Sequence, residues 1–279
     1  MKSDGNIFVQ IAAEGDLEAV KQALADGMDP NLKDDNGNTA LIEAAKGGHR
    51  ELANHLLEGG ADIEGRDDKY SGTALIWATL RGHTAMVELL LENGADINAT
   101  ENKNGMSAVV LAAVQGQAET IGKLLERGAD VESRDKDGRT PLMWAAHHGH
   151  VAVIEVLIDK GADLEAADSQ FGMTALMSAA AQNQTAAIEF LLDKGSRINA
   201  RMKDRRSALI LAVLMGHGET VKLLLERGAE VNARDSNQYT ALSLAKANQK
   251  SDVVKILEKA GGIEGKDIQE ATAKSFTIK

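Results

Sequence analysis

The chain has 279 residues, of which 43% are hydrophobic, 26% are charged and only 3% are aromatic, and its formal net charge is −11. This acidic balance disfavours nucleic acids and anionic membranes as partners, because both are bound mainly through Lys and Arg. The absence of cysteine excludes disulfides and cysteine-based zinc sites. The sequence shows neither a signal peptide nor a run of about 18 apolar residues, so we expect a cytoplasmic protein.

A short phrase of sequence returns along the chain. A degenerate first copy extends from Asn6 to about Gly37. Seven further copies begin with Thr or Ser, then Ala or Pro, then Leu or Val. They start at Thr39, Thr73, Ser107, Thr140, Thr174, Ser207 and Thr240, at spacings of 34, 34, 33, 34, 33 and 33 residues. A period of this length indicates a repeat architecture, and the sequence therefore predicts eight repeats.

The second repeat shows how each copy is expected to fold. Thr39 is a helix N-cap, and Leu41 begins the apolar face of the helix that follows. Gly48 permits a break before a second apolar helix, and Gly60 supplies a left-handed C-terminal stop. The polar segment 61–72 is then a projecting turn. Each repeat is therefore predicted to be a helix–turn–helix followed by a loop.

Two further steps recur inside the repeats. Gly-His starts at Gly48, Gly82, Gly149 and Gly216, and Gly-Ala-Asp starts at Gly60, Gly94, Gly128 and Gly161. With these steps the chain resembles the ankyrin-repeat family over residues 5–262. The resemblance implies an all-α solenoid of helix-turn-helix units joined by β-hairpin-like loops. The family's His after Leu is replaced by Ile42, Ile76, Val110, Met143, Met177, Ile210 and Ser243.

We expect a single domain over residues 1–279. Its ends should differ from its middle, because terminal repeats of a solenoid meet solvent on one side. The N-terminal capping repeat is predicted at about 5–37, the internal repeats at about 38–238 and the C-terminal capping repeat at about 239–262. The tail, 263–279, is compatible with a short helix over Ile263–Lys274.

Three projecting turns are one residue longer than the others, namely 67–72, 101–106 and 168–173. Tyr70 and Phe171 lie in two of them. Aromatic side chains on loop tips are typical of contact residues, so we expect both to bind a partner.

The helix period predicts a second contact surface. If Leu41 and its equivalents face the core, the residue two positions later is rotated by about 200° and points away. In ankyrin proteins this column lines the concave side. The column residues that we expect to contact a partner are Trp77, Leu80, Arg81, Leu111, Val114, Trp144, His147, His148, Leu214 and Met215. An exposed apolar strip indicates binding; the alternative is that these residues pack across neighbouring first helices and are mostly buried.

Two sets of basic residues lie near the turns. Arg66, Arg134, Arg201 and Arg234 recur in register, and for these we prefer local ion pairs with the neighbouring Asp67, Asp135 and Asp235 over recognition of a partner's carboxylate or phosphate. Lys203, Arg205 and Arg206 mark one turn that suits an anionic group of a partner.

Catalytic and metal-binding patterns are missing from the sequence. His147 and His148 point about 100° apart on a helix and chelate poorly together. No H-E-x-x-H, P-loop or Gly-x-Ser-x-Gly motif occurs. We therefore expect no cofactor, no metal and no enzymatic activity.

The sequence favours a monomeric protein–protein interaction scaffold that binds through the concave groove and the hairpin tips. Its acidic charge would suit a basic partner. The alternatives are an inhibitor or immunity protein that masks a basic enzyme or toxin, and a stiff spacer without a specific partner.

Overall fold

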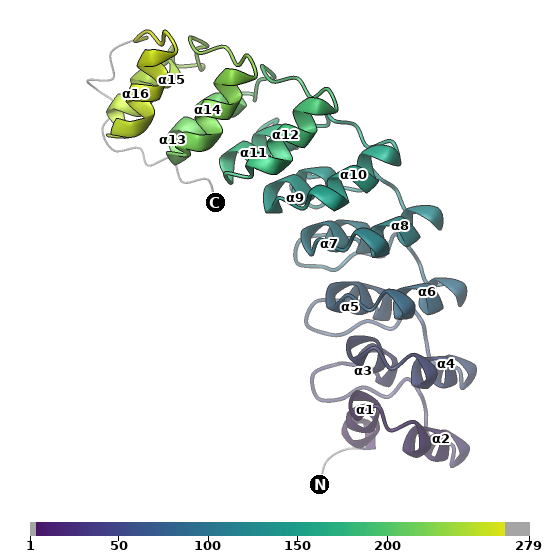
Figure 1. The fold of residues 1–279 in the computed structure, drawn as a ribbon. Helices are drawn as coiled ribbons and strands as arrows, with labels where there is room; N and C mark the ends of the chain where they lie inside the picture. The colour runs from purple at the N-terminus through teal and green to yellow at the C-terminus, as the bar shows by residue number, and fades with distance from the viewer. Residues whose placement is uncertain (1–3, 266–279) are drawn as a thin grey trace. The chain divides into compact units, whose positions relative to one another are not determined.

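The computed structural model describes residues 4–265, which form sixteen α-helices (Figure 1). They are α1 (Asp4–Glu14), α2 (Leu17–Ala25), α3 (Ala40–Gly47), α4 (Arg50–Glu58), α5 (Ala74–Arg81), α6 (Thr84–Glu92), α7 (Ala108–Val114), α8 (Ala118–Glu126), α9 (Pro141–His148), α10 (Val151–Asp159), α11 (Ala175–Ala181), α12 (Thr185–Asp193), α13 (Ala208–Met215), α14 (Gly218–Glu226), α15 (Ala241–Ala247) and α16 (Ser251–Lys259). The fold is all-helical, as predicted, with one helix pair for each repeat. The helix expected over Ile263–Lys274 falls on residues that lie, from 266 onward, outside the described part.

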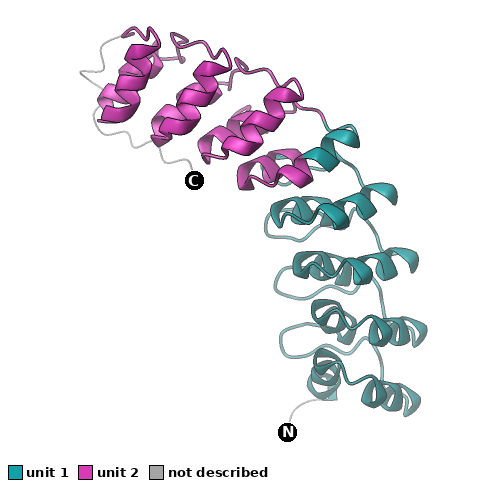
Figure 2. Cartoon of the chain, viewed as in Figure 1, with its two compact units in different colours: residues 1–141, 155–162 teal, residues 142–154, 163–279 magenta. Residues whose placement is uncertain are grey.

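The chain divides into two compact units, one of residues 1–141 and 155–162 and the other of residues 142–154 and 163–279 (Figure 2). In the first unit, the first helices α1, α3, α5 and α7 contact one another in order, and so do the second helices α2, α4, α6 and α8. In the second unit, α11, α13 and α15 form one row, and α12, α14 and α16 form the other. Each unit is therefore a helical solenoid.

Hydroxyl caps start the first helices where the sequence predicts them. The side chains of Thr39, Thr73 and Ser207 accept the N–H groups of the residues three positions later, at 3.3, 3.4 and 3.4 Å. Gly48 ends α3 in the left-handed region at φ 72°, which an L-residue adopts with strain. The apolar face that begins at Leu41 is buried. These local signals set the start, end and inner face of each first helix.

The Gly-His step joins consecutive repeats. The Nε2 atom of His83 lies 3.1 Å from the carbonyl oxygen of Lys46, at the end of the preceding first helix. His217 reaches the carbonyl oxygen of Ala181 in the same way, also at 3.1 Å. Gln117, which replaces His in its repeat, donates to the carbonyl of Thr79 at 2.8 Å. The step is structural, because its side chain bonds to a carbonyl in the last turn of the preceding first helix, where helical partners run out.

His83→Ala is expected to lower the free energy of unfolding by about 1 kcal/mol, the usual net contribution of one hydrogen bond. His83→Gln should restore most of that loss, because Gln117 makes the equivalent bond. Urea unfolding would measure both changes. His55→Ala is a control, since His55 is a half-buried residue of α4 outside the step. Equal stabilities of His83→Ala and His83→Gln would contradict this account.

The turn lengths confirm where the extra residues lie. In ordinary turns the closing backbone hydrogen bond joins residues four apart, as in Asp34–Asn38, Asp135–Arg139, Met202–Arg206 and Asp235–Tyr239. In the three longer turns it joins residues five apart, as in Asp67–Gly72, Glu101–Met106 and Asp168–Met173. Successive tips are also bonded, since the N–H of Asn102 donates to the carbonyl of Tyr70 at 2.8 Å and that of Lys203 donates to the carbonyl of Phe171 at 2.9 Å. Backbone hydrogen bonds therefore link the turn of one repeat to the turn of the next.

The predicted ion pair between Arg66 and Asp67 is wrong. The guanidinium of Arg66 donates instead to the carbonyl oxygens of Ser71 and Thr100, at 2.7 and 2.9 Å. Arg201 likewise bonds to a carbonyl of the next turn, that of Arg234 at 3.1 Å. It also pairs with Glu230 at 2.8 Å. These arginines connect one turn to the next, because a guanidinium has several donors and a turn exposes several carbonyls.

The basic turn at 203–206 is partly used within the fold. The ammonium group of Lys203 donates to the carbonyl of Ser169 at 2.5 Å. Arg206 is buried and lies 3.2 Å from Asp204. Arg205 is exposed. This weakens the expectation of an anionic partner group here, because two of the three cations already have partners in the chain.

Candidate functional site

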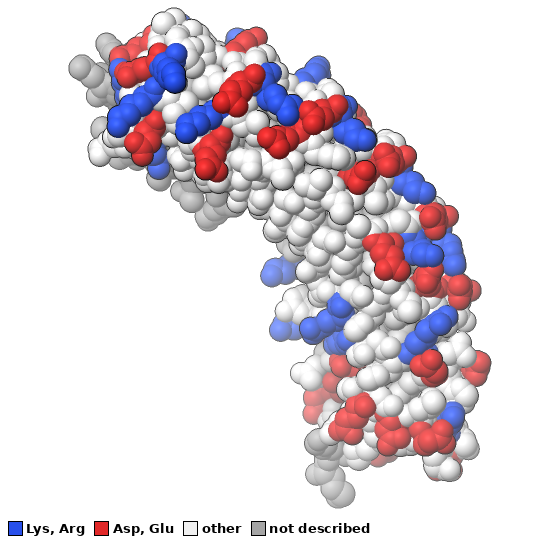
Figure 3. All heavy atoms as spheres, in the orientation of Figure 1, with Lys and Arg blue, Asp and Glu red and all other residues white. Residues whose placement is uncertain are grey.

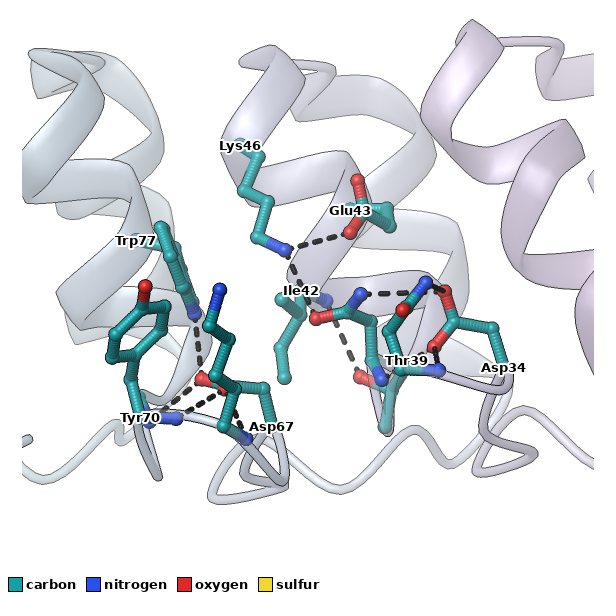
Figure 4. A network of polar contacts seen from close by, with 12 residues as sticks. Asp34, Thr39, Ile42, Glu43, Lys46, Asp67, Tyr70 and Trp77 are labelled. Atoms are coloured by element: carbon teal, nitrogen blue, oxygen red, sulfur yellow. Dashed lines mark hydrogen bonds and ion pairs between the residues drawn. The ribbon is translucent and has the colours of Figure 1, made fainter. Parts of the chain in front are cut away.

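The candidate site is built on Trp77 of α5 and on the long turn that precedes this helix (Figure 4). The carboxylate of Asp67 accepts the N–H groups of Lys69, Tyr70 and Gly72 at 2.9, 2.7 and 2.8 Å. It also accepts the indole N–H of Trp77 at 2.9 Å. Asp67 therefore closes the turn and holds the tryptophan against it.

The charge of Asp67 is stabilised by the groups that it binds. Burial alone would raise the pKa of this carboxyl, but hydrogen bonds from the Tyr70 backbone, the Trp77 indole and the Gly72 and Lys69 backbones outweigh burial and lower it. Asp67 is thus a carboxylate at neutral pH, with its oxygen atoms directed into the turn.

Gly72 is required by the close approach of the indole. A Cβ atom at position 72 would lie 2.9 Å from Nε1 of Trp77 and 3.1 Å from the carboxylate of Asp67. Both distances are shorter than ordinary van der Waals contact, so a side chain here would displace the tryptophan.

Two more side chains fix the Trp77 ring. Tyr70 meets it edge-on, with ring centroids 5.9 Å apart. Lys46 of α3 places its ammonium group 4.4 Å from the ring centroid, within the range of a cation–π interaction. Lys46 is held in turn by Glu43 at 2.7 Å and by Asn38 at 3.0 Å. The aromatic pair is therefore held in place before any partner arrives.

A pocket of about 340 Å³ opens beside this pair. Its walls come from α5, from α7 and from the two long turns that precede these helices. The lining residues are Tyr70, Gly72, Ile76, Trp77, Leu80, Glu101, Lys103, Asn104, Met106 and Leu111. We call this the Trp77 pocket. Its size is at the lower end of the roughly 300–1,000 Å³ typical of small-molecule sites, and most of its lining is apolar.

The pocket brings together four of the residues predicted from the sequence, namely Tyr70, Trp77, Leu80 and Leu111. Tyr70 is half-buried against Trp77 rather than fully exposed at a loop tip. Leu111 is only 7% exposed, so its expected exposure is wrong. Arg81 is exposed and Val114 is half-buried, and neither lines the pocket.

Sequence reasoning did not select the second wall of the pocket. Met106, Lys103, Asn104 and Glu101 belong to the long turn 101–106. The one-residue extension of that turn was a usable signal, because a longer turn projects further beside the helix that follows it.

The remaining predicted residues lie in the second unit. On α9, the rings of Trp144 and His148 are stacked with centroids 6.0 Å apart, and His147 lies edge-on to both. Burial lowers the pKa of His148, and the nearby His150 lowers it further. His148 is therefore mostly neutral at pH 7 and presents an aromatic ring beside Trp144.

In the second unit, only part of the column of outward residues on the first helices is accessible to solvent. Leu214 and Met215 are half-buried at the end of α13, whereas Leu211 of the same helix is 0% exposed. Phe171, at its turn, is 36% exposed. The alternative of packing between first helices thus holds for Leu211 and Leu111, and a partly accessible strip remains beside them.

Two kinds of feature are missing from the described residues. Among them, no group of three or more His, Asp or Glu side chains is placed to hold a metal ion. Within residues 4–265, no helix is both long and apolar enough to cross a membrane. The most developed feature is an apolar pocket with a fixed aromatic wall.

The comparisons with known proteins agree with this architecture. A family model described as ankyrin repeats (3 copies) matches residues 8–101, 99–168, 164–235 and 202–271. A search of curated proteins found no match. The overlapping family matches cover nearly the whole chain, and the helix pairs follow their period. The chain therefore belongs to the ankyrin-repeat family.

Proposed function

We propose that this protein is a protein-binding scaffold that holds a partner at the Trp77 pocket, with further contacts at the α9 aromatic face, at the end of α13 and at Phe171. The observation that carries the proposal is the fixed Tyr70–Trp77 pair beside an open apolar pocket. Rigid aromatic groups next to a pocket are typical of the residues that dominate binding energy. Ankyrin repeats are in general protein-interaction modules, and their members are typically not enzymes. A monomeric state and a cytoplasmic location remain predictions.

We prefer a scaffold over an inhibitor that masks a basic enzyme. Figure 3 shows acidic and basic side chains side by side over the second helices. Several of the acidic groups pair with Lys or Arg of the next repeat, as in Glu88–Lys123, Glu92–Arg127 and Asp193–Arg227. These pairs reduce the acidic field available to a basic enzyme, although the net charge stays negative. The masking role therefore has weaker support than the pocket.

Affinity capture with a pocket variant tests the scaffold. In Leu80→Glu a carboxylate replaces one half-buried wall of the pocket without touching the Asp67–Trp77 bond. We expect proteins captured by the wild type to be lost from this variant. Leu91→Glu is the matched control, because Leu91 is also half-buried but lies on α6. Circular dichroism and thermal unfolding would establish that both variants fold. If the folded Leu80→Glu protein captures the same proteins in the same amounts, the pocket assignment is wrong.

A further inference from the structure

The charged groups around the Trp77 pocket are buried acids and exposed lysines. Asp67 and Glu101 are buried. The carboxylate of Glu101 accepts the N–H groups of Lys103, Asn104 and Met106 at 2.6, 2.7 and 3.1 Å. Like Asp67, it is thus occupied by the turn that it closes. Both acids thus hold their own turns, and Glu101, which lines the pocket, is only 9% exposed.

Two exposed lysines lie beside these acids. Lys103 lines the pocket and is exposed. Lys69 is also exposed, and its ammonium group lies 5.0 Å from the ring centroid of Tyr70. Within residues 4–265, neither ammonium group has a carboxylate within ion-pair distance. By contrast, Lys46 is paired with Glu43, and Lys33 is paired with Asp68 at 2.6 Å.

The charge exposed near the pocket is opposite in sign to the net charge of the protein. The chain carries a net charge of −11, which by itself favours a basic partner. Lys103, which lines the pocket, and Lys69, which lies over the Tyr70 ring, are nevertheless positive and exposed. Charge complementarity at short range contributes to which segments a site accepts. The apolar walls and the small volume suit one large apolar side chain.

We propose that the Trp77 pocket binds an acidic linear segment of a partner protein, an inference that rests on the proposed function. One apolar side chain of the segment enters between Trp77, Leu80 and Met106. Carboxylates of flanking Asp or Glu residues meet the exposed ammonium groups of Lys69 and Lys103. The pocket then selects for an apolar anchor next to acidic residues, opposite to the partner that the net charge suggests.

Selection from a random peptide library displayed on phage, with the full chain immobilised, tests this chemistry. We expect the enriched peptides to carry Leu, Ile, Met or an aromatic residue close to Asp or Glu. The best peptide is then labelled with fluorescein, and its Kd is measured by fluorescence polarisation. The K69E/K103E variant should weaken binding by about tenfold at low salt, because two exposed attractive charge contacts are turned into repulsion. High salt should reduce this difference.

The control is K21E/K123E, which changes the net charge equally in the same compact unit but on the second helices α2 and α8. At about 0.1 M salt it should leave the Kd within about twofold of the wild type, since neither residue lines the pocket and the Debye length is then only about 10 Å. Peptides without acidic residues, or equal loss of affinity in K69E/K103E and the control, would overturn the proposed chemistry. If binding is then still lost in Leu80→Glu, the scaffold proposal stands and only the acidic specificity fails. If no enriched peptide depends on Leu80, both proposals fail.

Discussion

Asp67→Ala is expected to lower the free energy of unfolding by about 3 kcal/mol. The substitution removes the acceptor of three backbone N–H groups and of the Trp77 indole. Each buried donor left without a partner costs about 1–3 kcal/mol, and water can replace the carboxylate at only some of these positions because residue 67 is 3% exposed. Urea unfolding measures the loss. Hydrogen exchange of the amides of Lys69, Tyr70 and Gly72 would locate it.

Asp68→Ala is the control for this prediction. Asp68 is adjacent in sequence but exposed, and it pairs with Lys33, so its loss should cost less than about 1 kcal/mol. Similar effects of the two substitutions would show that Asp67 does not organise the turn.

The same carboxylate gives the stability a defined dependence on pH. The pKa of Asp67 in the folded protein lies below its ordinary value of 3.8. A lowered folded pKa contributes stability that is fully present above the unfolded pKa and is lost as pH falls through the folded pKa. The stability difference between the wild type and Asp67→Asn should therefore be constant near neutral pH and shrink below about pH 4. A difference that does not change with acidification would contradict the lowered pKa.

Leu211→Asp is expected to cost about 4 kcal/mol, against about 1 kcal/mol for Leu214→Asp. Both leucines belong to the column that the helix period assigns to the outer face of α13. Leu211 is fully buried, and α13 packs between α11 and α15. A carboxylate there loses its hydration without gaining a partner. Leu214 is half-buried, so an Asp at that position can remain in contact with water.

Urea unfolding of the two variants gives the comparison directly, because they place the same new residue on the same helix. Equal destabilisation would mean that the column is uniformly accessible or uniformly buried. A selective effect at Leu211 would show that the outer column is interrupted by packing between first helices.

The contrast between Leu211 and Leu214 shows what the helix period predicts and what it does not. A period gives the direction of a side chain within its own helix. It does not give the distance to the next helix, and that distance decides whether the side chain is covered. Leu111 is covered for the same reason, whereas Trp77 stays half-buried and forms part of the wall of a pocket.

The turns show the same limit for charged groups. Adjacency in sequence suggested that Arg66 pairs with Asp67. In the folded chain Asp67 is occupied by its own turn, and Arg66 reaches the carbonyl of Thr100 in the next repeat. Stacking of the repeats thus gives Arg66 a hydrogen-bond partner in the next repeat instead of an ion pair with its neighbour in sequence.

Sequence alone determined the repeats, their helix pairs, the caps such as Thr39 and the position of the extra turn residues, because these depend on local hydrogen bonding and on the spacing of apolar residues within one repeat. Only the tertiary structure decided that Tyr70, Trp77, Leu80 and Leu111 meet Met106 and Lys103 around one pocket. It also decided that the acids Asp67 and Glu101 are buried in their turns while Lys69 and Lys103 stay exposed. The physical reason is that these properties arise where one repeat packs on the next, and a single repeat does not contain them.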